Sequence, residues 1–445
     1  MANGLKLLRD LTARAVSNER FRQIAISASI LIVNLGAAYL LSAFLARGLG
    51  AAGFGLYSFV ISVVTILTIP ALFGLPTLVA KEMAAGLAKG NFSMVEGLVR
   101  RSRQFVSVTS LLMIAIGTAV IWLSSRGGAM KIDATYLFAI PLVAIISWAG
   151  ITAASLRGLG RVVESQWPEQ VLRPVMLLAL SALVFWYSKA HLTPTMAAGL
   201  TVVSALAALA INLYQWRRTM PAALRGVQPT FDDARWIKSV IPMGLTVGIL
   251  VLNAQVGIVL VGILSSTTDV AIFRVSSQTA QLCALGYTAV IMNVAPRIAA
   301  ASARGETGNM RNVILQGAVF ATAFSIPPAL IMVLFGGPLL SLLFSAPYSA
   351  GWLSLAVLAV GQVLNAAFGC ASVTLNMTGH ERDCSKAFFL GLVAQVALCF
   401  LLIPAFGVTG AAVASVAGVL VSNVILWRMA KIRTGIDAGV WAWRP

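Results

Sequence analysis

Uncharged polar side chains recur at helical spacing inside several otherwise apolar stretches of the chain. One stripe consists of Gln362, Asn365, Gly369, Ser372 and Asn376, at i, i+3, i+7, i+10 and i+14, which is one face of a helix. Polar groups face lipid only at a free-energy cost, so such a stripe needs either water or hydrogen bonds from neighbouring helices. For any single residue an interhelical hydrogen bond is the simpler interpretation. Taken together, the stripes favour a hydrated central cavity.

A second stripe, with Gln278, Gln281 and Thr288, also contains a basic residue, Arg274. Arg274 lies about 7 Å from the outer end of its predicted helix, from which it could also extend outward to the membrane surface. An arginine without a nearby acid suits an anionic ligand such as a phosphate. The candidate substrate-binding residues are Arg274, Gln278, Gln281, Gln362, Asn365, Asn34, Ser58, Ser62 and Asn253.

The chain offers little for catalysis or metal binding. Its only histidines, His191 and His380, have no set of Cys, Asp or Glu ligands nearby, and its four cysteines show no CxxC or disulfide pattern. The fourteen carboxylates are expected in loops, tails or first helical turns, which leaves no acid for a proton or sodium relay. Segment 48–53 matches GxGxxG but joins two apolar runs, so it indicates a turn. We predict no catalytic residue, no metal site and no cofactor.

The composition requires a membrane environment for the elements that carry these residues. Of the 445 residues, 59% are hydrophobic and 10% charged, whereas soluble proteins have roughly 25% charged residues. A helix needs roughly 20 apolar residues to cross a bilayer, and twelve runs of about that length are present. They are 24–46, 54–76, 105–124, 134–155, 168–188, 194–216, 237–263, 270–295, 312–335, 352–378, 386–404 and 408–427. We predict an all-α integral membrane protein with about twelve transmembrane helices.

The basic residues predict the orientation of these helices. Alternate loops and the two tails hold 26 lysines and arginines on one side, against four on the other. Basic loops stay in the cytoplasm, so both termini are predicted to be cytoplasmic. The net charge of +18 is then explained by topology, and no nucleic-acid partner is expected.

The longest polar stretch after the loop at 81–103 divides the chain into two sets of six helices. The predicted organisation is a cytoplasmic basic segment 1–23, a six-helix bundle 24–216, a cytoplasmic linker 217–236, a second six-helix bundle 237–427 and a cytoplasmic tail 428–445. An even number of helices gives the halves the same orientation, as in transporters built from parallel repeats. A shift of 211 residues aligns Ser204, Asn212 and Trp216 with Ser415, Asn423 and Trp427, which is weak support for such a repeat.

One motif resembles a known family. The stretch LARGLGAAGFGLYSF at 45–59, followed by GLP at 74–76 and KE at 81–82, is similar to the opening of Wzx-type polysaccharide repeat-unit flippases of the MOP superfamily, and LNMTGH at 375–380 is similar to their second-half pattern. The resemblance implies movement of an undecaprenyl-diphosphate-linked oligosaccharide from the cytoplasmic to the periplasmic leaflet of the bacterial inner membrane. It also implies a cationic cavity residue at the diphosphate, for which Arg274 is the candidate here.

Two other functions compete with this one. A MATE-like multidrug or small-molecule antiporter would share the architecture but normally uses acidic residues within its helices. A membrane-embedded glycan-assembly enzyme would need a polar loop with catalytic groups, and the outer loops are short. The expected partners are the lipid-linked oligosaccharide, membrane lipids and other polysaccharide-assembly proteins.

Overall fold

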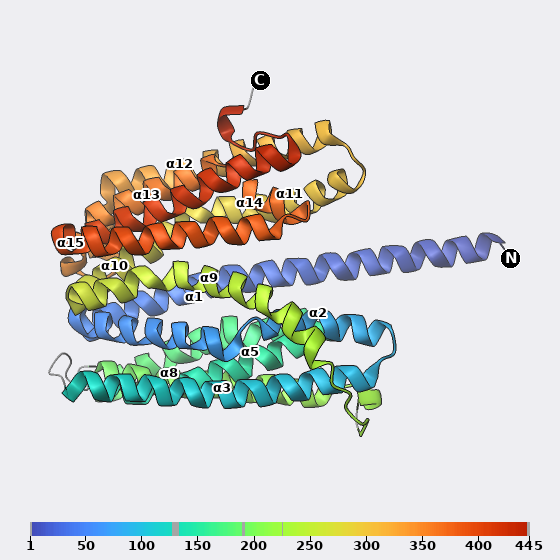
Figure 1. The fold of residues 1–445 in the computed structure, drawn as a ribbon. Coiled ribbons are helices and arrows are strands. Elements are labelled where there is room, and N and C mark those ends of the chain that lie inside the picture. The colour runs from blue at the N-terminus through green and yellow to red at the C-terminus, as the bar shows by residue number, and fades with distance from the viewer. Residues whose placement is uncertain (1, 127–132, 189–191, 225, 443–445) are drawn as a thin grey trace. The chain divides into compact units, whose positions relative to one another are not determined.

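The computed structural model describes residues 2–126, 133–188, 192–224 and 226–442 (Figure 1). Helices account for nearly all of this part of the chain, and no β-strand occurs in it. The α-helices are α1 (Ala2–Leu72), α2 (Leu75–Ala88), α3 (Phe92–Arg126), α4 (Ala134–Ala139), α5 (Leu142–Gly158), α6 (Val162–Trp167), α7 (Arg173–Ser188), α8 (Pro194–Thr219), α9 (Asp233–Leu264), α10 (Thr267–Ala280), α11 (Leu285–Ala303), α12 (Thr307–Leu343), α13 (Trp352–Ala367), α14 (Ala371–Met377) and α15 (Glu381–Thr434). Short turns of other helix types are η1 (Pro168–Leu172), η2 (Ala222–Leu224), η3 (Gln281–Ala284), η4 (Ala346–Gly351) and η5 (Val440–Ala442).

Two glycines account for the difference between the predicted number of spans and the observed number of long helices. Among the described residues, ten helical segments are long and apolar enough to cross a membrane. Two of them contain a residue with non-helical backbone angles, Gly50 in α1 (φ 67°, ψ 173°) and Gly407 in α15 (φ 54°, ψ −130°). Glycine adopts positive φ without the steric cost of a Cβ, so the chain can turn at both points. Because each segment divides into two spans, the all-α fold with twelve spans is confirmed.

Large apolar side chains cover the outward faces of these helices. On α3, Val108, Leu111 and Val120 are 67%, 65% and 56% exposed, and on α12 Phe324 and Leu334 are 63% and 61% exposed. Such extended apolar surfaces are unstable in water but are stable against lipid tails. The protein is therefore a multi-pass membrane protein.

By the density of their contacts, the helices form two compact units, of which the first comprises Met1–Ser42 and Leu67–Gly244. Within it, α5 packs against α2, α3 and α8. Ile151 and Ala154 of α5 lie in a buried cluster with Leu78 of α2, Leu98 of α3 and Trp236 of α9. The core of this unit is therefore built on α5.

Ion pairs connect helices of the first unit. Arg235 of α9 donates to Glu82 of α2, with Nη2 2.8 Å from Oε2. Glu82 was expected in a loop, and this expectation was wrong because the chain re-enters a helix directly after the turn at Gly74. Arg173 pairs with Glu169 at 3.2 Å, one helical turn earlier. The 169/173 spacing predicts this structural pair from the sequence, and the prediction is confirmed.

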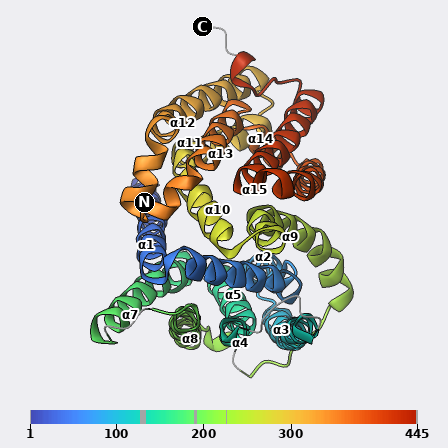
Figure 2. The ribbon, with the colours of Figure 1, turned by 90° about the vertical axis from the view of Figure 1, so that its left-hand side faces the viewer.

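The second unit comprises Ala43–Ile66 and Leu245–Pro445. In it α13 packs against α10, α12 and α15, as Figure 2 shows end-on. A buried apolar cluster joins Ile298 of α11, Ile314 of α12, Leu375 of α14 and Leu426 of α15. The two halves of α15 pack closely, because a Cβ built on Gly391 would lie 2.5 Å from the carbonyl oxygen of Gly418.

Hydrogen bonds connect the turn of α1 to other parts of the second unit, to which residues 43–66 belong. Arg47 donates from Nε to the carbonyl oxygen of Leu343 at 3.1 Å and from Nη2 to that of Leu342. These carbonyls end α12, where no further helical N–H is available to them. Tyr348 Oη lies 3.3 Å from the carbonyl oxygen of Ala46. The arginine of the family-like motif at 45–59 therefore caps a helix and also stabilises the negative end of its dipole.

The C-terminal segment folds back onto the second unit after α15. Ile436 and Ala438 are buried, and Trp427 Nε1 donates to Asp437 Oδ1 at 2.6 Å. A Cβ built on Gly369 would lie 2.1 Å from the carbonyl oxygen of Ala438. Residues 435–442 are therefore a packed part of this unit.

Candidate functional site

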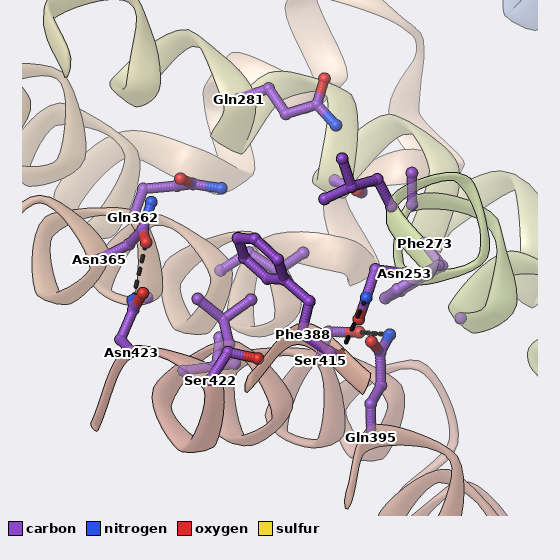
Figure 3. A pocket seen from close by; sticks show the side chains of 18 residues that line it. Asn253, Phe273, Gln281, Gln362, Asn365, Phe388, Gln395, Ser415, Ser422 and Asn423 are labelled. Atoms are coloured by element: carbon purple, nitrogen blue, oxygen red, sulfur yellow. Dashed lines mark hydrogen bonds between the residues drawn. The ribbon is translucent and has the colours of Figure 1, made fainter. Parts of the chain in front are cut away.

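A cavity of about 290 Å³ lies inside the second unit, between α9, α10, α13 and the two halves of α15 (Figure 3). Its walls carry a high proportion of uncharged polar side chains. These are Asn253, Ser277, Gln281, Gln362, Asn365, Gln395, Ser415, Ser422 and Asn423. Apolar contacts come from Phe273, Phe388, Leu250, Leu358, Val416 and Val419.

Helical periodicity brings these side chains to the cavity. Phe273, Ser277 and Gln281 follow at i, i+4 and i+8 along α10 and into η3, so all three lie on one face. Gln362 and Asn365 share a face of α13 in the same way. On α15 the chain turns at Gly407, so its first half and its second half each contribute one wall. The cavity is therefore lined by α10 with η3, by α13, by both halves of α15 and by the part of α9 that belongs to the second unit.

Hydrogen bonds hold part of this polar wall in place. Asn423 Nδ2 donates to Asn365 Oδ1 at 2.7 Å, and Gln395 Nε2 donates to Ser415 Oγ at 3.1 Å. Asn253 Nδ2 lies 3.0 Å from the carbonyl oxygen of Ile249. These bonds fix the directions in which the remaining lone pairs and N–H groups point.

The side-chain amides of two glutamines have donors and acceptors that can hydrogen-bond to a ligand or to water. Gln281 and Gln362 extend from η3 and α13 at the cavity (Figure 3) and form no hydrogen bond with the described residues. Each amide has two N–H donors and a carbonyl acceptor. No side chain that lines the cavity is charged. The arrangement can bind a neutral, hydroxyl-rich group, with the rings of Phe273 and Phe388 beside it.

The structure brings four of the predicted site residues together and separates the others from them. Asn253, Gln281, Gln362 and Asn365 all line the cavity. The remaining five do not line it, and they are Arg274, Gln278, Asn34, Ser58 and Ser62.

Each of these five has a different environment. Arg274 is half-buried on α10 and forms no ion pair with any described carboxylate. Asn34 belongs to the first unit, where its Nδ2 donates to the carbonyl oxygen of Gln170 at 2.6 Å. Ser58 and Ser62 are buried on α1, and Gln278 is half-buried on α10. Their direct role in binding stays a prediction.

The predicted continuous stripe on the tenth span was wrong. Gly369 has φ +70°, which ends α13 at Ala367 and starts the separate helix α14 at Ala371. Ser372 and Asn376 therefore leave the face of Gln362 and Asn365. The stripe on the eighth span is also interrupted, because η3 is a 3₁₀ turn, which has three residues per turn in place of 3.6.

Sequence reasoning missed several residues of this wall. Ser415 and Asn423 were noted only for the internal repeat, although their spacing of eight residues places them on one helical face. Gln395 is the single amide in the apolar stretch 386–404, and that isolation was a usable signal. Ser277 lies directly before Gln278 of the predicted stripe and is part of the face that lines the cavity.

Comparisons with known proteins identify the family of the chain. A family model described as "Polysaccharide biosynthesis protein" matches residues 21–302. The probable low-salt glycan biosynthesis flippase Agl15 of Haloferax volcanii is 21% identical over 397 residues, which cover 88% of this chain and 80% of that protein.

Two solved structures with a similar fold are named as a transporter and as a flippase. An inward-facing multidrug resistance MATE family transporter of the MOP superfamily aligns with a TM-score of 0.74 at 16% identity, over 91% of this chain and 94% of its own. The lipid II flippase MurJ, in an inward closed conformation, aligns with a TM-score of 0.67 at 12% identity, over 92% of this chain and 87% of its own.

Helical spans of this number and arrangement give the chain the fold of the MOP superfamily transporters that it resembles. Because the family model matches more than half of the sequence, the chain belongs to the polysaccharide biosynthesis protein family. The resemblance to Wzx-type flippases seen in the sequence is thereby confirmed.

The bond between Asn423 and Asn365 can be tested by a double-mutant cycle. Each change to alanine removes this amide pair, so we expect the two single variants and the double variant to lose similar amounts of stability. The expected coupling is about 1 kcal/mol, as for one neutral hydrogen bond. Thermal unfolding of the four purified proteins in detergent measures it. Strictly additive losses would contradict the bond.

Proposed function

We propose that this protein moves an undecaprenyl-diphosphate-linked oligosaccharide from the cytoplasmic to the periplasmic leaflet of the bacterial inner membrane by alternating access. Both termini are then cytoplasmic. Membership of the polysaccharide biosynthesis protein family supports the pathway. A relative named as a glycan biosynthesis flippase, and a similar fold in a protein named as a lipid II flippase, support a lipid-linked glycan as the cargo.

The observation that carries the proposal is the uncharged polar cavity of the second unit. A sugar presents hydroxyl groups at its rim and C–H groups on its faces. Amides and hydroxyls can exchange hydrogen bonds with the former, and phenylalanine rings can pack on the latter. We assign sugar contacts to Asn253, Gln281, Gln362 and Asn365, which line one cavity without a charged neighbour in its wall.

The anionic part of the cargo needs a cation. Arg274 is the candidate, because it lies within a spanning segment and forms no ion pair with a described carboxylate. A guanidinium presents parallel N–H groups that match phosphate oxygens. Interaction with other polysaccharide-assembly proteins stays part of the proposal.

A drug antiporter is not favoured by any particular observation. The likeness to MATE transporters is one of fold, at 16% identity. A cationic drug would be held best by a carboxylate, and none lines the cavity of the second unit. The neutral wall suits a glycan better.

Deletion of the gene tests the proposed function. We expect lipid-linked oligosaccharide to accumulate in a form that a membrane-impermeant reagent applied to spheroplasts cannot reach. Surface polysaccharide should be lost. The wild-type gene should restore export, whereas Gln362→Leu should restore it poorly at an equal protein level. Normal surface polysaccharide without accumulated intermediates after deletion would contradict the proposal.

A further inference from the structure

A half-buried arginine of the first unit lacks acceptors for two buried nitrogen atoms. Arg103 of α3 places its guanidinium carbon 5.2 Å from the centre of the Trp216 ring on α8, and Trp216 is itself buried. The Nε and Nη2 atoms of Arg103 are buried and form no hydrogen bond with the described residues. A buried charged donor that lacks an acceptor is costly. The Trp216 ring stabilises the cation through the face of the guanidinium. It does not accept the N–H groups that point outward in the plane of the guanidinium.

A pocket of about 530 Å³ opens beside this guanidinium. Arg100, Gln104 and Ser107 line it with Arg103, and Trp148 of α5 forms another wall. Nε together with an Nη group is the edge of a guanidinium that binds two oxygens of one anion. The pocket therefore has two cationic groups, one carboxylate and further polar side chains beside a guanidinium with unused donors.

The neighbouring acidic residues do not satisfy this edge. Glu96 also lines the pocket, but it forms no ion pair with Arg103 within the described part of the chain. Arg101, by contrast, is already engaged, because it donates from Nε to Asp233 at 2.9 Å. Arg101 therefore has a carboxylate of the protein as its ion-pair partner, whereas Arg103 has none among the described residues.

The position of the pocket along α3 points to a lipid as the source of the anion. The apolar run of α3 starts at Phe105, directly after Arg103 and Gln104. Val108 lines the pocket and is 67% exposed, and Leu111 one turn further is 65% exposed. The pocket therefore lies where the lipid-facing surface meets the basic end of the helix. Lipid phosphates occupy that level of a bilayer, and arginine and tryptophan are common there.

We propose that Arg103 and Arg100 form a binding site for the phosphate group of a lipid, at the boundary of the first unit with the bilayer surface. The phosphate oxygens accept from the guanidinium of Arg103, and Arg100 adds a second charge. The site requires only that the protein spans a membrane, so it does not depend on the transport function. The phosphate can come from an anionic phospholipid or from the diphosphate of a polyprenyl carrier.

Binding of two lipid probes by the purified full-length protein tests the site. In nanodiscs of phosphatidylcholine with phosphatidylglycerol, we expect native mass spectrometry to detect retained phosphatidylglycerol on the wild type. Arg103→Gln should bind it about tenfold more weakly, since a charge-assisted hydrogen bond pair is lost. Arg103→Lys should bind with intermediate affinity, because it keeps the charge but not the two-donor edge. Farnesyl diphosphate is the second probe and represents a polyprenyl diphosphate.

Matched variants separate the site from general charge and from folding. Arg218→Gln removes the same charge at an exposed position in the last turn of α8, and it should bind both probes as the wild type does. Arg100→Gln, which leaves the contact with Trp216 intact, should weaken binding even if Arg103→Gln folds poorly. Arg103-dependent binding of phosphatidylglycerol assigns the site to membrane lipid, and such binding of farnesyl diphosphate alone assigns it to a polyprenyl carrier. Binding of neither probe, or equal loss in Arg218→Gln, would overturn the proposal.

Discussion

Gly55→Val is expected to leave almost no folded protein. A Cβ at this position in α1 would lie 1.6 Å from the carbonyl oxygen of Thr267 and 3.2 Å from the backbone nitrogen of Ala271 in α10. Both atoms are backbone, so no side-chain rotation can relieve the overlap, and two helices of the second unit would have to separate. We expect a loss of at least about 3 kcal/mol, at the upper end for overpacking. Size-exclusion profiles and thermal unfolding in detergent measure this loss.

Gly36→Val in the same helix is the matched control for this prediction. A Cβ on Gly36 would meet no atom within 4 Å, and valine there also removes the backbone freedom of a helical glycine. The control should therefore fold at least as well as the wild type. Equal behaviour of the two variants, whether both fold or both fail, would mean that the close approach at Gly55 does not limit stability.

The role of Gly55 also shows what a motif can and cannot predict. The family-like stretch at 45–59 indicates a turn between two spans, and the structure has one at Gly50. Nothing in the stretch itself shows that Gly55 approaches α10 or that Arg47 caps α12. Thr267 and Leu343 are more than two hundred residues away in the sequence. Close approaches of this kind depend on tertiary packing, which local spacing does not encode.

The positions of spans were predictable because hydrophobic length is a local property. Twenty apolar residues cross a bilayer whatever they pack against, and the predicted spans 386–404 and 408–427 lie on either side of the observed break at Gly407. It was harder to predict which face of each helix lines the cavity. On α10 the cavity is lined by Phe273, Ser277 and Gln281, not by the face of Arg274 and Gln278.

That difference of one residue corresponds to about 100° of rotation around the helix. A polar stripe marks the face that avoids lipid, but a helix packed on several sides has more than one such face. Backbone breaks add to the uncertainty, since Gly369 ends the regular spacing after Asn365. The sequence therefore sufficed for four residues of the cavity, and the structure added Gln395 and Asn423 to its wall.

Arg274→Gln is expected to reduce transport of the lipid-linked oligosaccharide at least tenfold while the protein still reaches the membrane. Arg274 is half-buried on an apolar spanning segment and has no described carboxylate as a partner. Keeping an unpaired cation there is unfavourable for stability alone. If it binds the diphosphate, its loss removes charge-assisted hydrogen bonds worth about 1.5 to 3 kcal/mol, which is a factor of ten or more. Export of surface polysaccharide in a deletion strain, at matched protein levels, measures the effect.

Arg311→Gln provides the comparison that separates a local contact from net charge. Arg311 lies exposed in the first turns of α12, and its removal changes the charge of the protein by the same amount. This variant should export normally. Arg274→Lys should retain part of the activity, because an ammonium keeps the charge but not the paired N–H geometry. Full export by Arg274→Gln would exclude a role in binding, and an equal defect in Arg311→Gln would attribute the loss to overall charge. The expected order, wild type, then lysine, then glutamine, is the one that a direct phosphate contact requires.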